Sequence, residues 1–244
     1  MTATQEIRNC SSSDMLRWVQ SRAKSGSVER PTLVHADPPW QYSGAAPPKH
    51  GRATHNGNSS ADSHYGGMPM DAIVADLDLA FDVAAPDSYL VVWCTWPTVW
   101  EFAAAWFSHA PRWKHLTGGA WGKKGRQGIG FHMLGASEPL LVFRKGRPKP
   151  QCSPKVHNLW TTEGEGPFWE ERKPRTHSEK PPAALSDIVR LATGTGGHVV
   201  DLYAGASASL ARQCHLLGRN YLGAELDPDR HEAAVRLLDV IAGP

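Results

Sequence analysis

The chain has 244 residues, of which 41% are hydrophobic, and a formal net charge of +2 at pH 7. This length suits one α/β domain with a single buried core. No run reaches the ~20 apolar residues of a membrane-spanning helix, the polar N-terminus lacks the apolar core of a signal peptide, and the four cysteines form no Cys-x-x-Cys pair. The composition excludes a membrane span and a disulfide scaffold, and it predicts a cytoplasmic enzyme without a metal site.

Hydrophobic periodicity predicts strands and helices that alternate along most of the chain. Ile73, Leu77 and Phe81 recur at helical spacing, whereas Ser88–Thr95 is an apolar run bounded by turn residues, as in a buried strand. We expect residues 31–244 to form one domain. In chain order, the expected elements are a leader over 1–30 with a helix near 14–22, a strand at 32–36, a helix at 70–84, a strand at 88–95, a helix at 98–109, paired strands near 115–122 and 138–144, a helix at 181–193, a strand at 198–202, a helix at 210–217, a strand at 221–227 and a helix at 228–241.

The strand at 32–36 leads into the most informative motif of the chain, Asp37-Pro38-Pro39-Trp40. Its two prolines stiffen the backbone and remove two N–H donors, which leaves only carbonyl acceptors. A carboxylate precedes them and a large aromatic ring follows. The motif therefore suits a planar group that carries an NH₂, such as the Watson–Crick edge of adenine. A strand followed by a rigid Pro-Pro turn is the plainer alternative.

Two further segments are predicted to face a nucleic acid. Residues 41–67 form a long loop rich in Gly, Pro, Ser and His, and loops of this length are functional lids or disordered segments. Residues 112–175 form a basic insertion region, in which ten Lys or Arg residues lie between positions 112 and 155 and Glu138 is the only acid there. Such a block attracts phosphates independently of sequence, although a solvated basic surface is the alternative. The candidates for phosphate contacts are Lys123, Lys124 and Arg126.

Residues 198–227 have the layout of a nucleotide-binding βαβ unit. An apolar strand ends at Asp201, small residues including Gly205 lead into a helix, and the next strand ends near Glu225. Small residues let the backbone approach a ligand, and an acid at the end of the second strand can accept both ribose hydroxyls. The two acids are 24 positions apart, close to the ~20 typical of such units. Only one glycine of the usual set is present, so an ordinary packing turn is the alternative.

Together, these two motifs resemble the MT-A70 family of S-adenosylmethionine-dependent adenine-N6 methyltransferases. The resemblance covers roughly residues 31–228 in the family's order, with the catalytic motif first and the cofactor motif last. It departs at Ser207, where the family or its relatives often have glycine or arginine. It implies an α/β, Rossmann-like class I methyltransferase fold with a doubly wound, mostly parallel sheet and a circularly permuted motif order. Further matching segments are His64-Tyr65-Gly66-Gly67-Met68, Trp121-Gly122-Lys123, Gly128-Ile129-Gly130, Glu138-Pro139-Leu140-Leu141 and residues 175–181.

The resemblance also implies roles for individual residues. Asp37 and Pro38 are expected near the base and the methionine part of the cofactor, Lys180 at the cofactor carboxylate, and Glu225 at its ribose. The expected catalytic set is Asp37, Pro38, Pro39 and Trp40. The expected cofactor set is Asp37, Lys180, Asp201, Tyr203, Gly205 and Glu225. The expected substrate set is Trp40, His64 and Tyr65, with Lys123, Lys124 and Arg126 on the phosphates.

We therefore predict that the chain transfers a methyl group from S-adenosylmethionine to the N6 amine of adenine in DNA. DNA is favoured over RNA because the compact chain carries no added RNA-binding module. Alternatives are adenine N6 in RNA or a nucleoside, and cytosine N4, which presents a similar amine. A non-catalytic nucleic-acid-binding subunit of the same fold is the alternative outside catalysis. Neither the recognition sequence nor the oligomeric state follows from the sequence.

Overall fold

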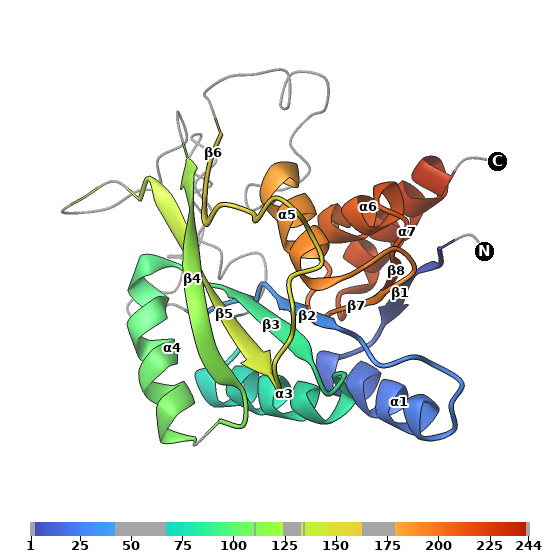
Figure 1. The fold of residues 1–244 in the computed structure, drawn as a ribbon, viewed down its shortest axis with the longest axis horizontal. Coiled ribbons are helices and arrows are strands. Elements are labelled where there is room, and N and C mark those ends of the chain that lie inside the picture. Colours follow the sequence, from blue (N-terminus) through green and yellow to red (C-terminus); the bar gives the residue numbers. More distant parts are fainter. Residues whose placement is uncertain are drawn as a thin grey trace, which may run out of the picture.

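The structure, a computed structural model, describes residues 3–41, 67–109, 111–123, 133, 135–162 and 179–242. In this part of the chain, eight strands form one sheet in the order β1-β8-β7-β2-β3-β5-β4-β6 (Figure 1). The strands are β1 (Gln5–Asn9), β2 (Leu33–Ala36), β3 (Ser88–Trp93), β4 (Lys114–Lys123), β5 (Ser137–Lys145), β6 (Leu159–Thr162), β7 (His198–Asp201) and β8 (Asn220–Glu225). The helices are α1 (Ser12–Lys24), α3 (Met70–Val83), α4 (Trp96–Ser108), α5 (Pro182–Ala192), α6 (Ser209–Leu216) and α7 (Pro228–Ala242).

The sheet is mostly parallel. β1, β8, β7, β2 and β3 run parallel, β5 is antiparallel to both β3 and β4, and β6 is parallel to β4. β2 and β7 lie side by side although they are far apart in the sequence, and the strand order proceeds away from them in opposite directions. Ligands of open α/β sheets bind at such a switch point, outside the carboxyl ends of the strands. The carboxyl ends of β2 and β7 are therefore the place to look for a site.

Helices cover both faces of the sheet. Figure 1 shows α1, α3 and α4 on one face and α5, α6 and α7 on the other. Side chains of β2 point alternately to the two cores, as the pleat requires, because Val34 packs with the first set of helices and Leu33 with the second. The predicted α/β, doubly wound, Rossmann-like fold is confirmed, and the expected strands and helices of residues 31–244 are present.

The N-terminal residues are part of this fold. β1 forms one edge of the sheet, where Ile7 is in register with Gly223, and α1 buries Met15, Leu16 and Val19 completely. The expectation of a separate leader over 1–30 is corrected accordingly. β1 was not expected from the sequence because Ile7 is its one buried residue, so no apolar alternation marks this edge strand.

The region 112–175 also belongs to the sheet, because it supplies β4, β5 and β6. It is therefore not an insertion into the fold over its described residues. β4 and β5 pair antiparallel as predicted. β6 was not expected, because its four residues follow a segment rich in Pro and Gly. Among the described residues, no helix has both the length and the apolar character needed to cross a membrane.

Candidate active site

A cavity of about 890 Å³ opens at the carboxyl ends of β2, β7 and β8. Its size is within the ~300–1,000 Å³ of small-molecule pockets. It extends from the turn after β2 past the end of β8 to Ser11 and Asp227. It brings together every residue of the expected catalytic and cofactor sets, namely Asp37, Pro38, Pro39, Trp40, Lys180, Asp201, Tyr203, Gly205 and Glu225.

The turn after β2 is held by its own backbone and by the core. The Trp40 N–H donates to the Pro38 carbonyl oxygen at 2.8 Å, so this carbonyl has one lone pair left for another donor. The Trp40 indole N–H donates to the Trp93 carbonyl at 3.1 Å, and its ring makes an edge contact with Phe102 at 5.6 Å between centroids. Trp40 is only 6% exposed. It therefore forms a wall of the cavity, with little of its ring exposed.

Four side chains of alternating charge lie along the β2–β5 side of the cavity, and we call Asp37, Lys180, Glu138 and Lys123 the charge chain. The Lys180 ammonium lies 2.5 Å from Oδ2 of Asp37 and 3.3 Å from Oε2 of Glu138. Glu138 also accepts a hydrogen bond from the ammonium of Lys123. Lys180 is 6% exposed, so its charge depends on these acids in place of water. The expected contact of Lys180 with a cofactor carboxylate stays a prediction.

The chain sets the protonation of its members. Burial raises the pKa of the Asp37 carboxyl, with Lys180 opposing this rise and Glu138 adding to it. Burial works against the charge of Lys180, but Asp37 and Glu138 raise its pKa above the usual value. Burial also works against the charge of Glu138, but Lys180 and Lys123 bring its pKa below the usual value. Lys180 and Glu138 are therefore held in their charged forms, whereas burial works against the ionised form of Asp37.

Asp201, at the end of β7, forms part of the cavity floor and is held by neutral donors. Its Oδ1 lies 2.9 Å from Nδ1 of His35, and its Oδ2 accepts from the Tyr221 hydroxyl at 3.0 Å. Nε2 of His35 accepts from the Trp93 indole N–H at 3.0 Å. Because an indole nitrogen only donates, Nε2 is the unprotonated nitrogen and the His35 proton is on Nδ1. We call Trp93, His35, Asp201 and Tyr221 the buried network; it links β3, β2, β7 and β8.

Glu225, at the end of β8, faces the turn that follows β7. Its Oε2 accepts from the Gly205 N–H at 3.0 Å, and its Oε1 accepts from the Asp227 N–H at 2.9 Å. Burial raises the pKa of this carboxyl. Gly205 has a φ of +67°, and a side chain added there would meet no protein atom within 4 Å. Glycine is therefore favoured at this position because the backbone is left-handed, and the absence of a side chain leaves the turn open to the cavity.

Tyr203 anchors the same turn. Its hydroxyl donates to Oδ2 of Asp76 on α3 at 3.2 Å, and the Ser12 hydroxyl at the start of α1 donates to the same oxygen. Burial raises the pKa of Asp76 and raises that of Tyr203 well above its usual value, so the phenol stays protonated. The aromatic residue expected in the cofactor set thus ties the turn to two helices.

Comparison with known proteins agrees with this geometry. The family model N6_N4_Mtase, described as DNA methylase, matches residues 33–236. The chain belongs to this DNA methylase family. The matching model is not that of the MT-A70 family, and this finer resemblance stays a prediction. No curated protein matches the chain in sequence.

Solved structures show the same fold as this DNA methylase at low sequence identity. The M1.HpyAVI–SAM complex has a TM-score of 0.67 at 15% identity, covering 96% of this chain and 98% of that one. The PvuII DNA methyltransferase, cytosine-N4-specific, has a TM-score of 0.69 at 16% identity, covering 98% and 88%. TTHA0409 from Thermus thermophilus, complexed with S-adenosyl-L-methionine, has a TM-score of 0.64 at 16% identity, covering 99% and 96%. The predicted class I methyltransferase fold is thereby confirmed.

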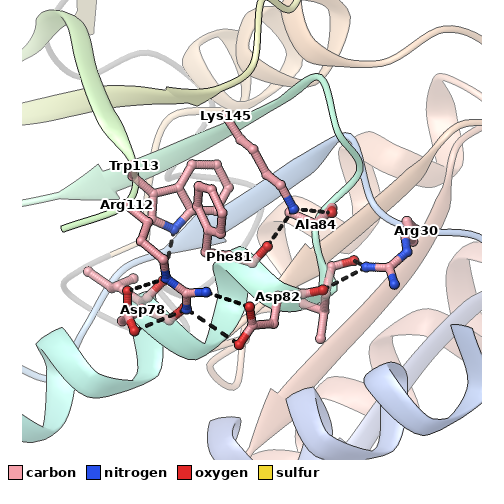
Figure 2. Close-up of polar contacts among 10 residues, drawn as sticks. Arg30, Asp78, Phe81, Asp82, Ala84, Arg112, Trp113 and Lys145 are labelled. Atoms are coloured by element: carbon pink, nitrogen blue, oxygen red, sulfur yellow. Dashed lines mark hydrogen bonds and ion pairs between the residues drawn. The ribbon is translucent and has the colours of Figure 1, made fainter. Parts of the chain in front are cut away.

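Part of the basic block of this DNA methylase has structural partners. Figure 2 shows Arg112 between two acids of α3: its Nε lies 3.0 Å from Asp78 and its Nη1 lies 2.5 Å from Asp82. Its guanidinium also lies 4.7 Å from the centre of the Phe81 ring. Lys145 donates to the carbonyl of Phe81 at 2.7 Å (Figure 2). These two cations join α3 to β4 and β5, and Lys123 belongs to the charge chain. The phosphate contact expected of Lys123 stays a prediction.

Other expected site residues of this DNA methylase lie outside the described residues. These are His64 and Tyr65 of the 41–67 loop, together with Lys124 and Arg126. Among the described residues, no three His, Cys, Asp or Glu side chains gather as metal ligands would. The four cysteines are unpaired.

Glu138, His35 and Asp76 take part in the site although the sequence assigned no site role to them. Glu138 carried one usable signal, because it is the only acid in a strongly basic stretch.

Proposed function

We propose that this DNA methylase transfers the methyl group of S-adenosylmethionine to the N6 amine of adenine in DNA. The observation that carries the proposal is the meeting of Asp37 and Glu225 in one cavity at the switch point of the sheet. An acid suited to a ribose lies at one end, and an acid suited to an amino group lies at the other. We also propose that the enzyme acts in the cytoplasm, where its four unpaired cysteines would stay reduced.

The cofactor occupies the side formed by β7 and β8 in this proposal. Glu225 accepts the ribose hydroxyls, since each carboxylate oxygen has lone pairs beyond the one that it gives to a backbone N–H. Gly205 lets the turn approach the ligand, and Asp201 is the acid nearest to the amino group of the methionine part. The similar M1.HpyAVI and TTHA0409 structures, which are complexes with S-adenosylmethionine, support this choice of cofactor.

The target amine lies against the turn after β2 in this proposal. Because Oδ2 of Asp37 is bound to Lys180, Oδ1 is the oxygen available to accept one N6 hydrogen, and the Pro38 carbonyl accepts the other. These bonds favour a pyramidal nitrogen, whose lone pair is otherwise delocalised into the ring. The lone pair then forms the N–C bond while the C–S pair returns to sulfur, and the amine loses one proton to Asp37 or to water. Such a reaction requires mainly positioning and preorganised charge.

The base itself must leave the duplex, which costs a few kcal/mol, approximately, of stacking and pairing. We place the rim of Trp40 against the flipped base, with His64 and Tyr65 on the target side and Lys123, Lys124 and Arg126 nearest the phosphates. Of these, Trp40 lines the cavity of the described residues, and Lys123 is bound to Glu138, which also lines it.

Cytosine N4 is the second candidate, because the matching family model carries both N6 and N4 in its name and the PvuII enzyme is cytosine-N4-specific. Adenine is favoured by the Asp37-Pro38-Pro39-Trp40 motif and its resemblance to the MT-A70 family. RNA, a free nucleoside and a non-catalytic role are the remaining alternatives.

Mass spectrometry of nucleosides tests the proposal. The protein is incubated with S-adenosylmethionine carrying a CD₃ group and with duplex DNA, single-stranded DNA, RNA or adenosine, and each product is digested to nucleosides. We expect CD₃ on N6 of deoxyadenosine from DNA, and about 100-fold less label or lower still at equal times with the Asp37→Asn variant. Label on cytosine N4, in RNA or on adenosine would select the corresponding alternative. No label in any nucleoside would overturn the enzymatic proposal.

A further inference from the structure

We propose that Glu138 is a positioning residue: it shares the Lys180 ammonium, which favours the ionised Asp37 carboxylate, and so keeps that carboxylate a stronger acceptor for the target amine than pairing with Lys180 alone would. This inference rests on the proposed function, because it assigns Asp37 to the amine. It gives Lys180 a role toward Asp37 in addition to the cofactor contact expected from the sequence.

Lys180 is shared between two acids. It precedes α5, Asp37 follows β2, and Glu138 lies on β5, so three separate elements converge on one ammonium group. The ammonium also lies 5.5 Å from the centre of the Trp93 ring. Glu138 is itself fixed by Lys123 at the end of β4. Backbone elements on both sides therefore hold the cation between the two acids.

The charges of the four groups balance. A buried lysine paired with Asp37 alone would neutralise that carboxylate almost completely and weaken it as an acceptor. The second acid, Glu138, competes for the same ammonium. Asp37 therefore keeps more of its negative charge available to accept a hydrogen bond. Lys123 in turn offsets the charge of Glu138, so that the four groups sum to zero. A cavity with little water can hold such a balanced chain, whereas an unpaired member would be costly.

The surroundings of Asp37 show that Lys180 and Glu138 control it in opposite directions. Burial is the main cause of its raised pKa, Lys180 lowers it and Glu138 raises it. The neighbouring His35 directs its Nδ1–H at Asp201. Cys94 of the segment after β3 also faces Asp37, but burial raises the pKa of its thiol, which stays neutral. Among the described residues, Lys180 and Glu138 are thus the charged side chains that act most strongly on Asp37, and they carry opposite signs.

The test is the pH dependence of methyl transfer in a single turnover, with the full-length protein, a DNA oligonucleotide and saturating S-adenosylmethionine. The acid limb of this profile reports the ionisation of Asp37. Glu138→Gln should move the limb to lower pH, because it removes a negative neighbour. Lys180→Met should move the limb to higher pH by about one to three units, because Asp37 loses an opposite charge at ion-pair distance. Glu232→Gln, which removes an exposed acid of α7 that pairs with Arg236, is the matched control and should move nothing.

Opposite shifts in the two variants support the proposal, since a merely structural role would lower the rate at every pH without moving the limb. If the wild-type protein transfers the methyl group, the proposal is overturned when the acid limb shifts in the same direction in both variants, or does not move in variants that fold. Absence of transfer by the wild-type protein would instead overturn the proposed function and this inference with it. If Lys180→Met does not fold, infrared spectroscopy of the Glu138→Gln variant replaces it, and the carboxyl band of Asp37 is assigned by its loss in the Asp37→Asn background. Titration of this band at lower pH than in the wild type supports the proposal. Unchanged titration overturns it.

Discussion

The two sides of the cavity hold their acids in different ways. On the β7–β8 side, Asp201 and Glu225 accept hydrogen bonds from neutral donors: an imidazole, a phenol and backbone N–H groups. On the β2–β5 side, Asp37 and Glu138 are bound to lysine ammonium groups. Both sides use carboxylates that are largely removed from water, so the difference lies in the partners.

Neutral donors fix the orientation of a carboxylate without cancelling its charge. Ion pairs cancel part of the charge and couple the pKa values of all members. The first arrangement suits a cofactor whose hydroxyls and amine need fixed acceptors. The second suits a reacting amine, for which the acceptor strength of one oxygen has to be adjusted. We therefore expect the β7–β8 side to fix the position of the cofactor, and the β2–β5 side to adjust the charge at the target amine.

Loss of Asp37 should give the largest effect. Asp37→Asn keeps the size of the side chain but removes the carboxylate that accepts the amine hydrogen, so single-turnover transfer should fall by about 100-fold or more. The free energy of unfolding should change little, because Lys180 keeps Glu138 as a partner. Transfer above about a tenth of the wild-type rate, a deficit below ~1.4 kcal/mol, would contradict the role of Asp37.

The buried network offers the next test. His35→Phe removes the donor to Asp201 and the acceptor of Trp93, so chemical denaturation should show a loss of about 1–3 kcal/mol. A double-mutant cycle with Trp93→Phe should be non-additive, since the two residues share one bond.

Thr32→Val is the matched control for this loss. The Thr32 hydroxyl oxygen is buried and has no hydrogen-bond partner among the described residues, so its removal should cost nothing. An equal loss of unfolding free energy in His35→Phe and Thr32→Val would show that any substitution in this part of the chain is destabilising, whether or not it removes a hydrogen bond.

The raised pKa of Glu225 gives opposite pH trends for stability and cofactor affinity. Its folded-state pKa lies above the unfolded value, so its contribution to stability is fully present below the unfolded pKa and is lost as pH rises through the folded pKa. Ribose binding needs the carboxylate and therefore weakens as pH falls through the same range. The increase in Tm caused by S-adenosylmethionine should thus be larger at neutral than at mildly acidic pH.

Glu225→Gln should reduce the affinity for S-adenosylmethionine by about tenfold, a loss within the 1–3 kcal/mol of a hydrogen bond to a charged group. It should also flatten the pH dependence of the Tm increase. Calorimetry that finds unchanged affinity would place the ribose elsewhere in the cavity.

The smallest effect is expected from a substitution of Arg112. This substitution distinguishes a structural role of the charge from a role in binding nucleic acid. Arg112→Ala should lower the free energy of unfolding by about 1 kcal/mol or less, because its ion pairs are exposed to water. Hydrogen bonding to Arg112 lowers the pKa of Asp82, so this contribution should disappear as pH falls through the acidic range. The slope of log affinity for DNA against log salt should stay unchanged. A slope reduced by about 0.9 would show that Arg112 contacts a phosphate.

The sequence was sufficient for most of the fold, because the strands of the parallel core are continuous apolar runs and the helices have clear apolar faces. It was insufficient for β1 and β6, whose short segments bury too few side chains to show a period. Asp37 and Glu225 could be singled out because one directly follows a strand and the other ends one, each within a short motif.

The partners of these acids could not be predicted in the same way. Lys180 lies 143 positions from Asp37, and His35 lies 166 positions from Asp201, so each pairing depends on the order of strands in the sheet. The sequence likewise shows that Trp40 is aromatic but not that Phe102 and Trp93 enclose it. Local spacing thus predicted the acids, and only the packed sheet revealed what they bind.

The division of work between the two sides is tested most directly by the single-turnover rate as a function of S-adenosylmethionine concentration, measured for Asp37→Asn and Glu225→Gln under the same conditions. We predict that Asp37→Asn lowers the plateau rate and leaves the half-saturating concentration unchanged, and that Glu225→Gln raises the half-saturating concentration and leaves most of the plateau. The reverse pattern, or a lower plateau together with a raised half-saturating concentration in both variants, would contradict this division.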